Sequence, residues 1–212
     1  MHITVKREHL IKPLGVVAGV VERRQTLPIL SNLLIRSSGK SITLTGTDLE
    51  VEVSATVAGS GSELEMTLPA RKLHEICRAL PADSEISIGL DKDKAVVRSG
   101  KSRFKLLTMP VAEFPNIETA SWNSSFSIPQ KDLRWLLEKT MFCMAHQYVR
   151  YYLNGLLVEI SNDLLRMVAT DGHRLSLAEA PIKSQVGNSQ VILPRKGVLE
   201  IAGFLENTGG NV

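Results

Sequence analysis

The sequence predicts an α+β protein made of two copies of one unit, each with two helices packed on antiparallel sheets, the second copy being truncated. The first observation is a repeat: FSIPQKDLRWLL, from Phe126, follows the pattern of ITVKREHLIKPL, from Ile3, 123 residues earlier. Some segments carry apolar residues at helical spacing, and others alternate apolar with polar residues as half-buried strands do. Short polar connections such as SSGKS and DKDK join the alternating segments, which antiparallel strands allow.

The repeat keeps its register along the chain. Thr47 and Asp48 are matched 123 residues later by Thr170 and Asp171. The helical segment LPARKLHEICRAL returns as LPRKGVLEIAGFL at an offset of 125 residues. Agreement over such distances indicates an internal duplication.

Residues 81–122 of the first copy have no counterpart after Val212. We therefore predict a first domain over residues 1–122, an incomplete second domain over residues 123–212, and a boundary near residues 120–125. A sheet without its closing strands exposes unpaired backbone groups. We expect the chain to be a fragment of a longer parent.

The first helix of each copy is predicted from its apolar stripe. Apolar residues share one face in the first copy at Leu10, Leu14, Val17 and Val21, and in the second at Leu133, Leu136, Leu137, Met141 and Met144. Lys131, Arg134 and Lys139 are left for the opposite face of the second helix. Pro13 is expected near the first turns, where a missing N–H does least harm.

Alternation predicts the strands between the helices. Ile42 and Leu44 share one face. Farther on, we expect the apolar side chains to face inward and the acidic ones outward in a strand that includes Leu49, Val51 and Val53 with Glu50 and Glu52.

Composition indicates a globular protein and argues against several kinds of functional site. Its 212 residues are 43% hydrophobic, without an apolar run that could span a bilayer or a secretory signal in MHITVKREHL, so a cytoplasmic protein is expected. Cys77 and Cys143 lie on apolar helix faces without zinc-site spacing, and are predicted to be reduced core residues. No glycine-rich phosphate loop is present; we expect no metal and no cofactor.

Charge is distributed unevenly although the net charge is only +3. The helical windows 6–24, 71–78, 131–139 and 195–200 hold 13 Lys or Arg and six Asp or Glu, which leaves the rest of the chain acidic. A surface of one sign attracts a polyanion to that surface alone.

Two segments carry candidate functional residues. In TDGHRLSL, Asp171, His173 and Ser176 suggest a hydrolase, but TDLEVEVS occupies the same place in the first copy, so a turn is the better interpretation. HQYVRYYLNG, which begins at His146, is an aromatic and basic cluster suited to phosphate or base contact. A loop with partly buried tyrosines is the alternative.

Basic pairs add to the nucleic-acid interpretation. Arg23 and Arg24 form one pair, and we interpret Arg71 and Lys72 as recurring at Arg195 and Lys196. Because helix starts favour acids, an anionic partner would explain basic pairs there. A solvated face is the alternative.

The motifs REHL, RQTLPILSNLL, LTGTDLE, VRSGKSRFKL, EFPN, VRYYLNG, ATDGHRL and PRKGV together resemble the bacterial DNA polymerase sliding clamp, the beta subunit of the replicative polymerase. The resemblance covers essentially the whole chain. It implies repeated DNA-clamp domains and, in a parent with a third domain that is absent here, a head-to-tail dimer closing a ring around duplex DNA. It also implies a processivity factor, not an enzyme, that tethers the polymerase.

The resemblance also implies functional residues. DNA contacts are expected at Arg24, Arg71, Gln147, Tyr151 and Tyr152. One wall of a pocket for partner peptides is expected at Leu153, Thr170, Gly172, His173, Arg174 and Leu175. The edge that closes the dimer is expected at Lys72, Lys101, Arg103, Phe104 and Leu106.

The implied partners are double-stranded DNA, bound without sequence specificity, together with the polymerase, the clamp loader and repair proteins through short peptide motifs. We expect a nucleoid-associated homodimer ring that contacts no membrane. Two alternatives remain: a duplex-binding module that does not encircle DNA, and an enzyme using the Asp171 and His173 region.

Overall fold

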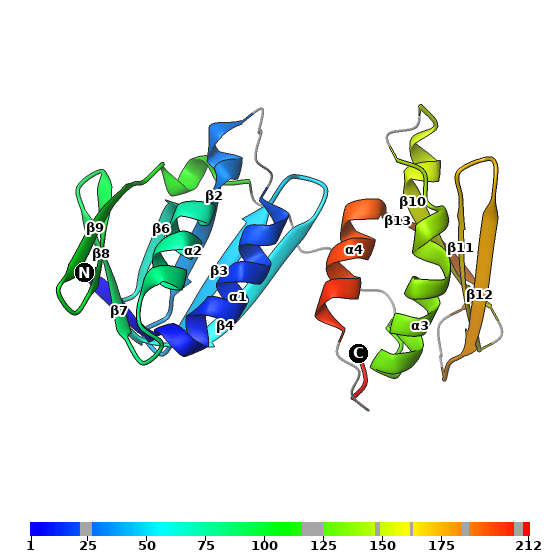
Figure 1. Ribbon diagram of the computed structural model, residues 1–212, viewed down its shortest axis with the longest axis horizontal. Helices are drawn as coiled ribbons and strands as arrows, with labels where there is room; N and C mark the ends of the chain where they lie inside the picture. The colour runs from blue at the N-terminus through cyan, green and yellow to red at the C-terminus, as the bar shows by residue number, and fades with distance from the viewer. Residues whose placement is uncertain (22–26, 116–124, 147–148, 162, 184–186, 206–209) are drawn as a thin grey trace. The chain divides into compact units, whose positions relative to one another are not determined.

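The computed structural model describes all residues except 22–26, 116–124, 147–148, 162, 184–186 and 206–209. It divides into two compact units, Met1–Glu118 and Thr119–Val212, each described below by itself (Figure 1). The predicted domain boundary near residues 120–125 falls mostly outside the described residues. No helix in the described ranges has the length and hydropathy needed to cross a membrane.

In its described residues, the first unit contains two α-helices and two antiparallel sheets, with strand orders β5-β1-β7-β8-β9 and β4-β3-β2-β6. Its elements, including the 3-10 helices η1 and η2, are β1 (His2–Lys6), α1 (Arg7–Val20), η1 (Pro28–Ser31), β2 (Asn32–Ser37), β3 (Ser41–Thr47), β4 (Glu52–Ala58), β5 (Ser60–Gly61), β6 (Leu64–Pro69), α2 (Ala70–Ala79), β7 (Glu85–Asp91), β8 (Lys94–Ser99), β9 (Ser102–Leu107) and η2 (Val111–Glu113). Helix α1 packs against α2, β3 and β4.

The second unit repeats the helix pair and the four-stranded sheet, whose order is β12-β11-β10-β13. Its elements are α3 (Gln130–Thr140), η3 (Met141–Cys143), η4 (Tyr151–Asn154), β10 (Gly155–Ser161), β11 (Leu164–Thr170), β12 (Leu175–Pro181), β13 (Ser189–Pro194) and α4 (Arg195–Phe204). Helix α3 packs on β11 and β12, and α4 packs on β10 and β13. Both units therefore have the predicted α+β architecture, and within the described residues the second has no counterpart of the five-stranded sheet.

The predicted apolar faces form the cores. In the first unit the core contains all four predicted residues, namely Leu10, Leu14 and Val17 of α1 and its C-cap Val21, together with Cys77. In the second unit Leu136, Leu137 and Met144 are buried, with Leu133 and Met141 packed against them. Both cysteines are buried and free, as predicted, although Cys143 lies in η3. Pro13 is the seventh residue of α1, just after the first turns that were expected to hold it.

The prediction for Leu49 and Val51 is wrong. Strand β4 begins at Glu52, and the residues before it form a turn. Leu49 has a φ of +80° and is 54% exposed, so it lies in the left-handed region with its side chain in solvent. The turn reverses the chain between β3 and β4, which interrupts the alternation that the sequence pattern suggested.

A row of polar side chains crosses the four-stranded sheet at the same position in both units. In the first unit Arg36 bonds to Glu65 at 3.0 Å and Thr43 to Thr56 at 3.0 Å. In the second unit the matching residues are joined by three hydrogen bonds, Gln190 to Glu159 at 3.1 Å, Arg166 to Glu159 at 3.1 Å and Arg166 to Glu179 at 2.6 Å. The duplication therefore extends to side-chain contacts on the solvent side of the sheet.

Candidate nucleic-acid interface and partner surfaces

Arginines at the starts of the helices hold the ends of their neighbours. In the first unit Arg7 donates from Nε to the carbonyl of Cys77 at 2.7 Å and from Nη2 to that of Arg78 at 3.2 Å. Arg71 of α2 donates in return to the carbonyl of Val21, at the end of α1, at 2.8 Å. The last carbonyls of a helix lack intrahelical donors and favour cations, so each helix satisfies the end of the other.

The second unit has a comparable pair of bonds, although Arg134 is the fifth residue of α3 and matches Ile11, not Arg7. Arg134 of α3 donates to the carbonyl of Leu205 at 3.3 Å, and Arg195 of α4 donates to that of Met144 at 3.3 Å. Met144 corresponds to Val21 at the offset of 123 residues. Equivalent carbonyls are therefore satisfied in both units by an arginine of the second helix.

The predicted match between the two basic pairs is wrong by one residue. Pro69 and Pro194 occupy the same N-cap position before α2 and α4, so Arg195 matches Ala70 and Lys196 matches Arg71. The capping bonds also give Arg71 and Arg195 an internal role. Their place at a helix start does not by itself require an anionic partner.

The structure describes only some of the predicted DNA contacts. Arg24 and Gln147 lie outside the described residues, and Tyr151 is described only as the first residue of η4. Tyr152 is 48% exposed in the second unit, and Arg71 is exposed in the first. The DNA-contact set remains a prediction.

A cavity between α1 and α2 collects basic side chains around Arg71. Gly15 and Gly19 lie on its α1 side, and His74, Arg78 and the acidic Glu75 accompany Arg71 on α2. A Cβ at Gly15 would lie 3.3 Å from His74 Nε2, so glycine allows the two helices to approach closely here. Sequence analysis did not single out His74 or Arg78 as site residues, although their spacing from Arg71 on one helix face was a usable signal.

The turn between β11 and β12 carries most of the predicted peptide-pocket residues. Asp171 Oδ1 accepts hydrogen bonds from the backbone N–H groups of His173 and Arg174, each at 3.0 Å. Thr170 Oγ1 accepts the N–H of Gly172 at 3.1 Å and donates to the carbonyl of Arg174 at 2.8 Å. The N–H of His173, the N–H of Arg174 and the Arg174 side chain lower the pKa of Asp171 to about 2.

The same bonds form in the first unit 123 residues earlier. Asp48 Oδ1 accepts the N–H groups of Glu50 and Val51, and Thr47 Oγ1 accepts that of Leu49. A shared turn therefore explains the Thr-Asp pair in both units, as predicted.

Apolar side chains surround the β11–β12 turn of the second unit. Arg174 donates from Nη2 to the carbonyl of Phe142 at 2.9 Å, and its guanidinium carbon lies 5.8 Å from the Phe142 ring centre. Phe142 is 55% exposed and Leu175 64% exposed. Leu153 is half-buried at the end of η4. Phe142 was not predicted, although its place off the apolar stripe of α3 indicated an exposed aromatic residue.

The turn gives the hydrolase interpretation no support. Both carboxylate oxygens of Asp171 are occupied, Oδ2 by Arg174 Nε at 2.9 Å. The Ser176 hydroxyl donates to the carbonyl of Lys139, so it is not paired with a base. Within the described ranges, no cluster of His, Cys, Asp and Glu has the makings of a metal site.

Strand β9 is an edge strand, because within the described residues it pairs only with β8. Of the predicted dimer-edge residues, Lys101 and Arg103 are exposed, whereas Leu106 is buried and Phe104 packs against the core. Lys72 is exposed on α2. The free backbone edge of β9 and its exposed side chains are available to a partner. Leu106 instead packs in the core beneath the strand.

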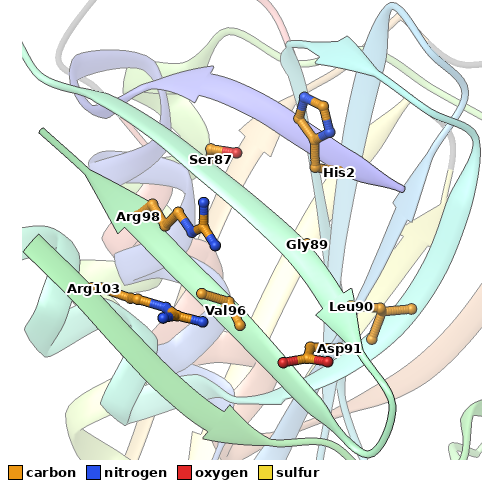
Figure 2. Close-up of a pocket in the computed structure, with 8 residues that line it drawn as sticks. All are labelled: His2, Ser87, Gly89, Leu90, Asp91, Val96, Arg98 and Arg103. Atoms are coloured by element: carbon orange, nitrogen blue, oxygen red, sulfur yellow. The ribbon is translucent and has the colours of Figure 1, made fainter.

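A hollow lies beside this edge on the outer face of the five-stranded sheet. Figure 2 shows the side chains of His2, Arg98, Arg103 and Asp91 around Gly89, which adds no side chain to the surface. Arg98 and Arg103 lie directly opposite each other in β8 and β9. Among the described residues neither has a hydrogen-bond or ion-pair partner, so this part of the edge is strongly basic.

Comparisons with known proteins also divide the chain into two domains. The model of the DNA polymerase III beta subunit N-terminal domain matches residues 1–118, and that of its central domain matches residues 127–212. The beta sliding clamp of Pseudomonas aeruginosa is 51% identical over all of this chain, and that of Escherichia coli K12 is 48% identical over 97% of it. The chain spans 59% and 57% of the length of these relatives.

Solved structures give the same result. A crystal structure of the DNA polymerase III subunit beta from Pseudomonas aeruginosa matches the whole chain with a TM-score of 0.96 at 49% identity, and the chain covers 58% of it. The Caulobacter crescentus pol III beta structure matches with a TM-score of 0.94 at 39% identity and is 59% covered. This chain belongs to the DNA polymerase III beta subunit family, whose members include the beta sliding clamps.

Proposed function

We propose that the parent of this chain is a DNA sliding clamp, a processivity factor that encircles duplex DNA and tethers the replicative polymerase. The duplicated unit carries the proposal, because two copies with the same helix pair, sheet, turn and arginine caps are what a ring of repeated domains requires. A third domain and a head-to-tail dimer would close that ring. The protein would act in the cytoplasm, at the nucleoid, by topology and without catalysis.

The helix layer is the proposed DNA-facing surface. The cavity around Arg71 and Arg78 supports this, since two arginines lie on it beside a single acid, Glu75. Each DNA phosphate that a cationic side chain neutralises raises the affinity. It also makes the slope of log binding constant against log salt concentration steeper by about 0.9. A clamp that slides needs few such contacts, and we propose Arg24, Arg71, Gln147, Tyr151 and Tyr152 for them.

The Asp171 turn and its apolar surroundings form the proposed wall of a peptide pocket. Solved clamps of Pseudomonas aeruginosa and Bartonella birtlesii are described as bound to griselimycin. Here Leu175 and Phe142 offer apolar area beside the Arg174–Asp171 ion pair, which suits a short peptide from the polymerase, the clamp loader or a repair protein. The present chain would supply one wall only, so we expect it to bind such a peptide more weakly than the parent does.

Primer extension tests the proposal. The parent protein, its polymerase and its clamp loader are mixed on a primed circular template, and product length is measured after a trap prevents rebinding. A clamp lengthens the products of a single binding event, and omission of the loader removes the effect. Unchanged product length would contradict the proposal and favour a duplex-binding module that does not encircle DNA.

A further inference from the structure

The solvent face of α3 carries an exposed tryptophan between two lysines. Lys131, Trp135 and Lys139 are four residues apart, so they lie in one row with about 6 Å between neighbours along the helix axis. All three are exposed, Trp135 by 46%. The core-facing side of the same helix is supplied by Leu136 and Leu137, which leaves Trp135 without a role in the core.

The row keeps its positive charge. Glu138, on the same side of the helix, is held by Arg134, whose Nε lies 2.8 Å from its Oε1. Asp132 lies in the first turn, where the helix dipole favours an acid. Among the described residues, neither the Lys131 nor the Lys139 ammonium has a hydrogen-bond or ion-pair partner. Two uncompensated cations therefore flank the indole ring.

The duplicated unit shows that the fold does not require this row. At the offset of 123 residues Trp135 corresponds to Lys12, which is exposed on α1, and Lys131 corresponds to Glu8. A position that accepts lysine in one copy needs no aromatic side chain for packing. The row is a property of α3 and not of the shared scaffold.

We infer that Lys131, Trp135 and Lys139 form a contact site for single-stranded nucleic acid, in which an unpaired base stacks on Trp135 and the lysines bind the adjoining phosphates. Stacking on an aromatic ring needs a free base face, which a paired duplex does not offer. The inference rests on the proposed function only in that DNA is the partner. It adds a preference for unpaired strand, such as that beside a primer end.

Tryptophan fluorescence reports directly on the site. The chain has two tryptophans, so Trp122→Phe leaves Trp135 as the only source of the signal. We expect oligothymidylate to quench this emission, and a blunt duplex of equal length to quench it little. In anisotropy titrations, Trp135→Ala should weaken oligothymidylate binding about 5- to 150-fold. Lys131→Ala and Lys139→Ala should each reduce the slope of log binding constant against log salt concentration by about 0.7.

Phe204→Ala is the matched control, because Phe204 is an aromatic residue that is 41% exposed on α4; it should leave binding unchanged. Circular dichroism melts establish that Trp135→Ala is folded. The inference is overturned if oligothymidylate does not quench Trp135, or if Trp135→Ala weakens duplex and single-strand binding equally or not at all. Primer extension by the parent carrying Trp135→Ala separates the two proposals. If the variant still lengthens the products but oligothymidylate does not quench Trp135, the sliding-clamp function stands and the base-stacking site is wrong.

Discussion

Exchanging the residues at the left-handed position of the two matching turns should change stability in opposite directions. Leu49 has a φ of +80°, and Gly172, its counterpart 123 residues later, has a φ of +89°. Side chains other than glycine are strained in this region. We expect Leu49→Gly to stabilise the first unit and Gly172→Leu to destabilise the second.

The structure sets the magnitude. A residue with a Cβ pays roughly 1–2 kcal/mol in the left-handed conformation, whereas glycine loses roughly 0.5–1 kcal/mol more conformational entropy on folding. Leu49 is 54% exposed, so truncation costs little burial, and a Cβ at position 172 has no atom within 4 Å. The net change should be about 0.5–1 kcal/mol, with opposite signs at the two positions.

Urea unfolding of the 212-residue chain measures both changes. Far-UV circular dichroism follows the transitions, because every tyrosine and tryptophan of the chain lies after residue 118 and therefore outside the first unit. The free energy of unfolding comes from linear extrapolation. Leu49→Ala is the control, because it removes the exposed side chain but keeps a Cβ at the strained position. Its free energy of unfolding should stay close to that of the unchanged chain.

Equal stabilisation by Leu49→Ala and Leu49→Gly would refute the reasoning, since the effect would then belong to the leucine side chain. A neutral Gly172→Leu variant would also contradict it, because no steric clash competes with backbone strain at that position.

Three further outcomes follow from the helix ends, the turn and the core. Arg71→Met removes the hydrogen bond to the Val21 carbonyl and should lower the free energy of unfolding of the first unit by about 1 kcal/mol; loss of DNA affinity with unchanged stability would contradict the capping role. The pKa of Asp171 is lowered to about 2 from 3.8, so its contribution to stability should be complete above pH 3.8 and lost as the pH falls toward 2. The Asp171→Asn variant should therefore lose less free energy of unfolding than the unchanged chain over that pH window. Identical acid profiles would show that the Asp171 carboxylate does not stabilise the turn. Burial raises the pKa of Cys77 to about 11 and Cys143 is also buried, so neither thiol should react with a disulfide reagent at pH 7 until denaturant is added; rapid labelling of the folded chain would show that the core opens.

Local patterns predicted the helices because the apolar residues of each helix lie on one face, and that face is buried. Leu10, Leu14 and Val17 occupy the core as their spacing required. The same reasoning failed at Leu49 and Val51, because alternation continued across the turn at Asp48. A short stretch of alternation does not reveal where the chain reverses.

The candidate sites show a similar division. The duplication predicted the turn at Asp171, because a shared motif at one offset requires a shared local structure. The reciprocal arginine caps could not be predicted, since Arg71 and Val21 meet only when the two helices pack. The hollow at Gly89 likewise depends on the register between β7 and its neighbours, which no local pattern specifies.

Retention on DNA of defined topology tests the central claim most directly. The parent protein is loaded by its clamp loader on a nicked circular plasmid, separated from free protein by gel filtration, and examined before and after one linearising cut. A threaded ring should stay on the circle and leave once the ends are free. Equal retention on circular and linear DNA would mean binding by surface contact alone, and would contradict the account of this chain as part of a sliding clamp.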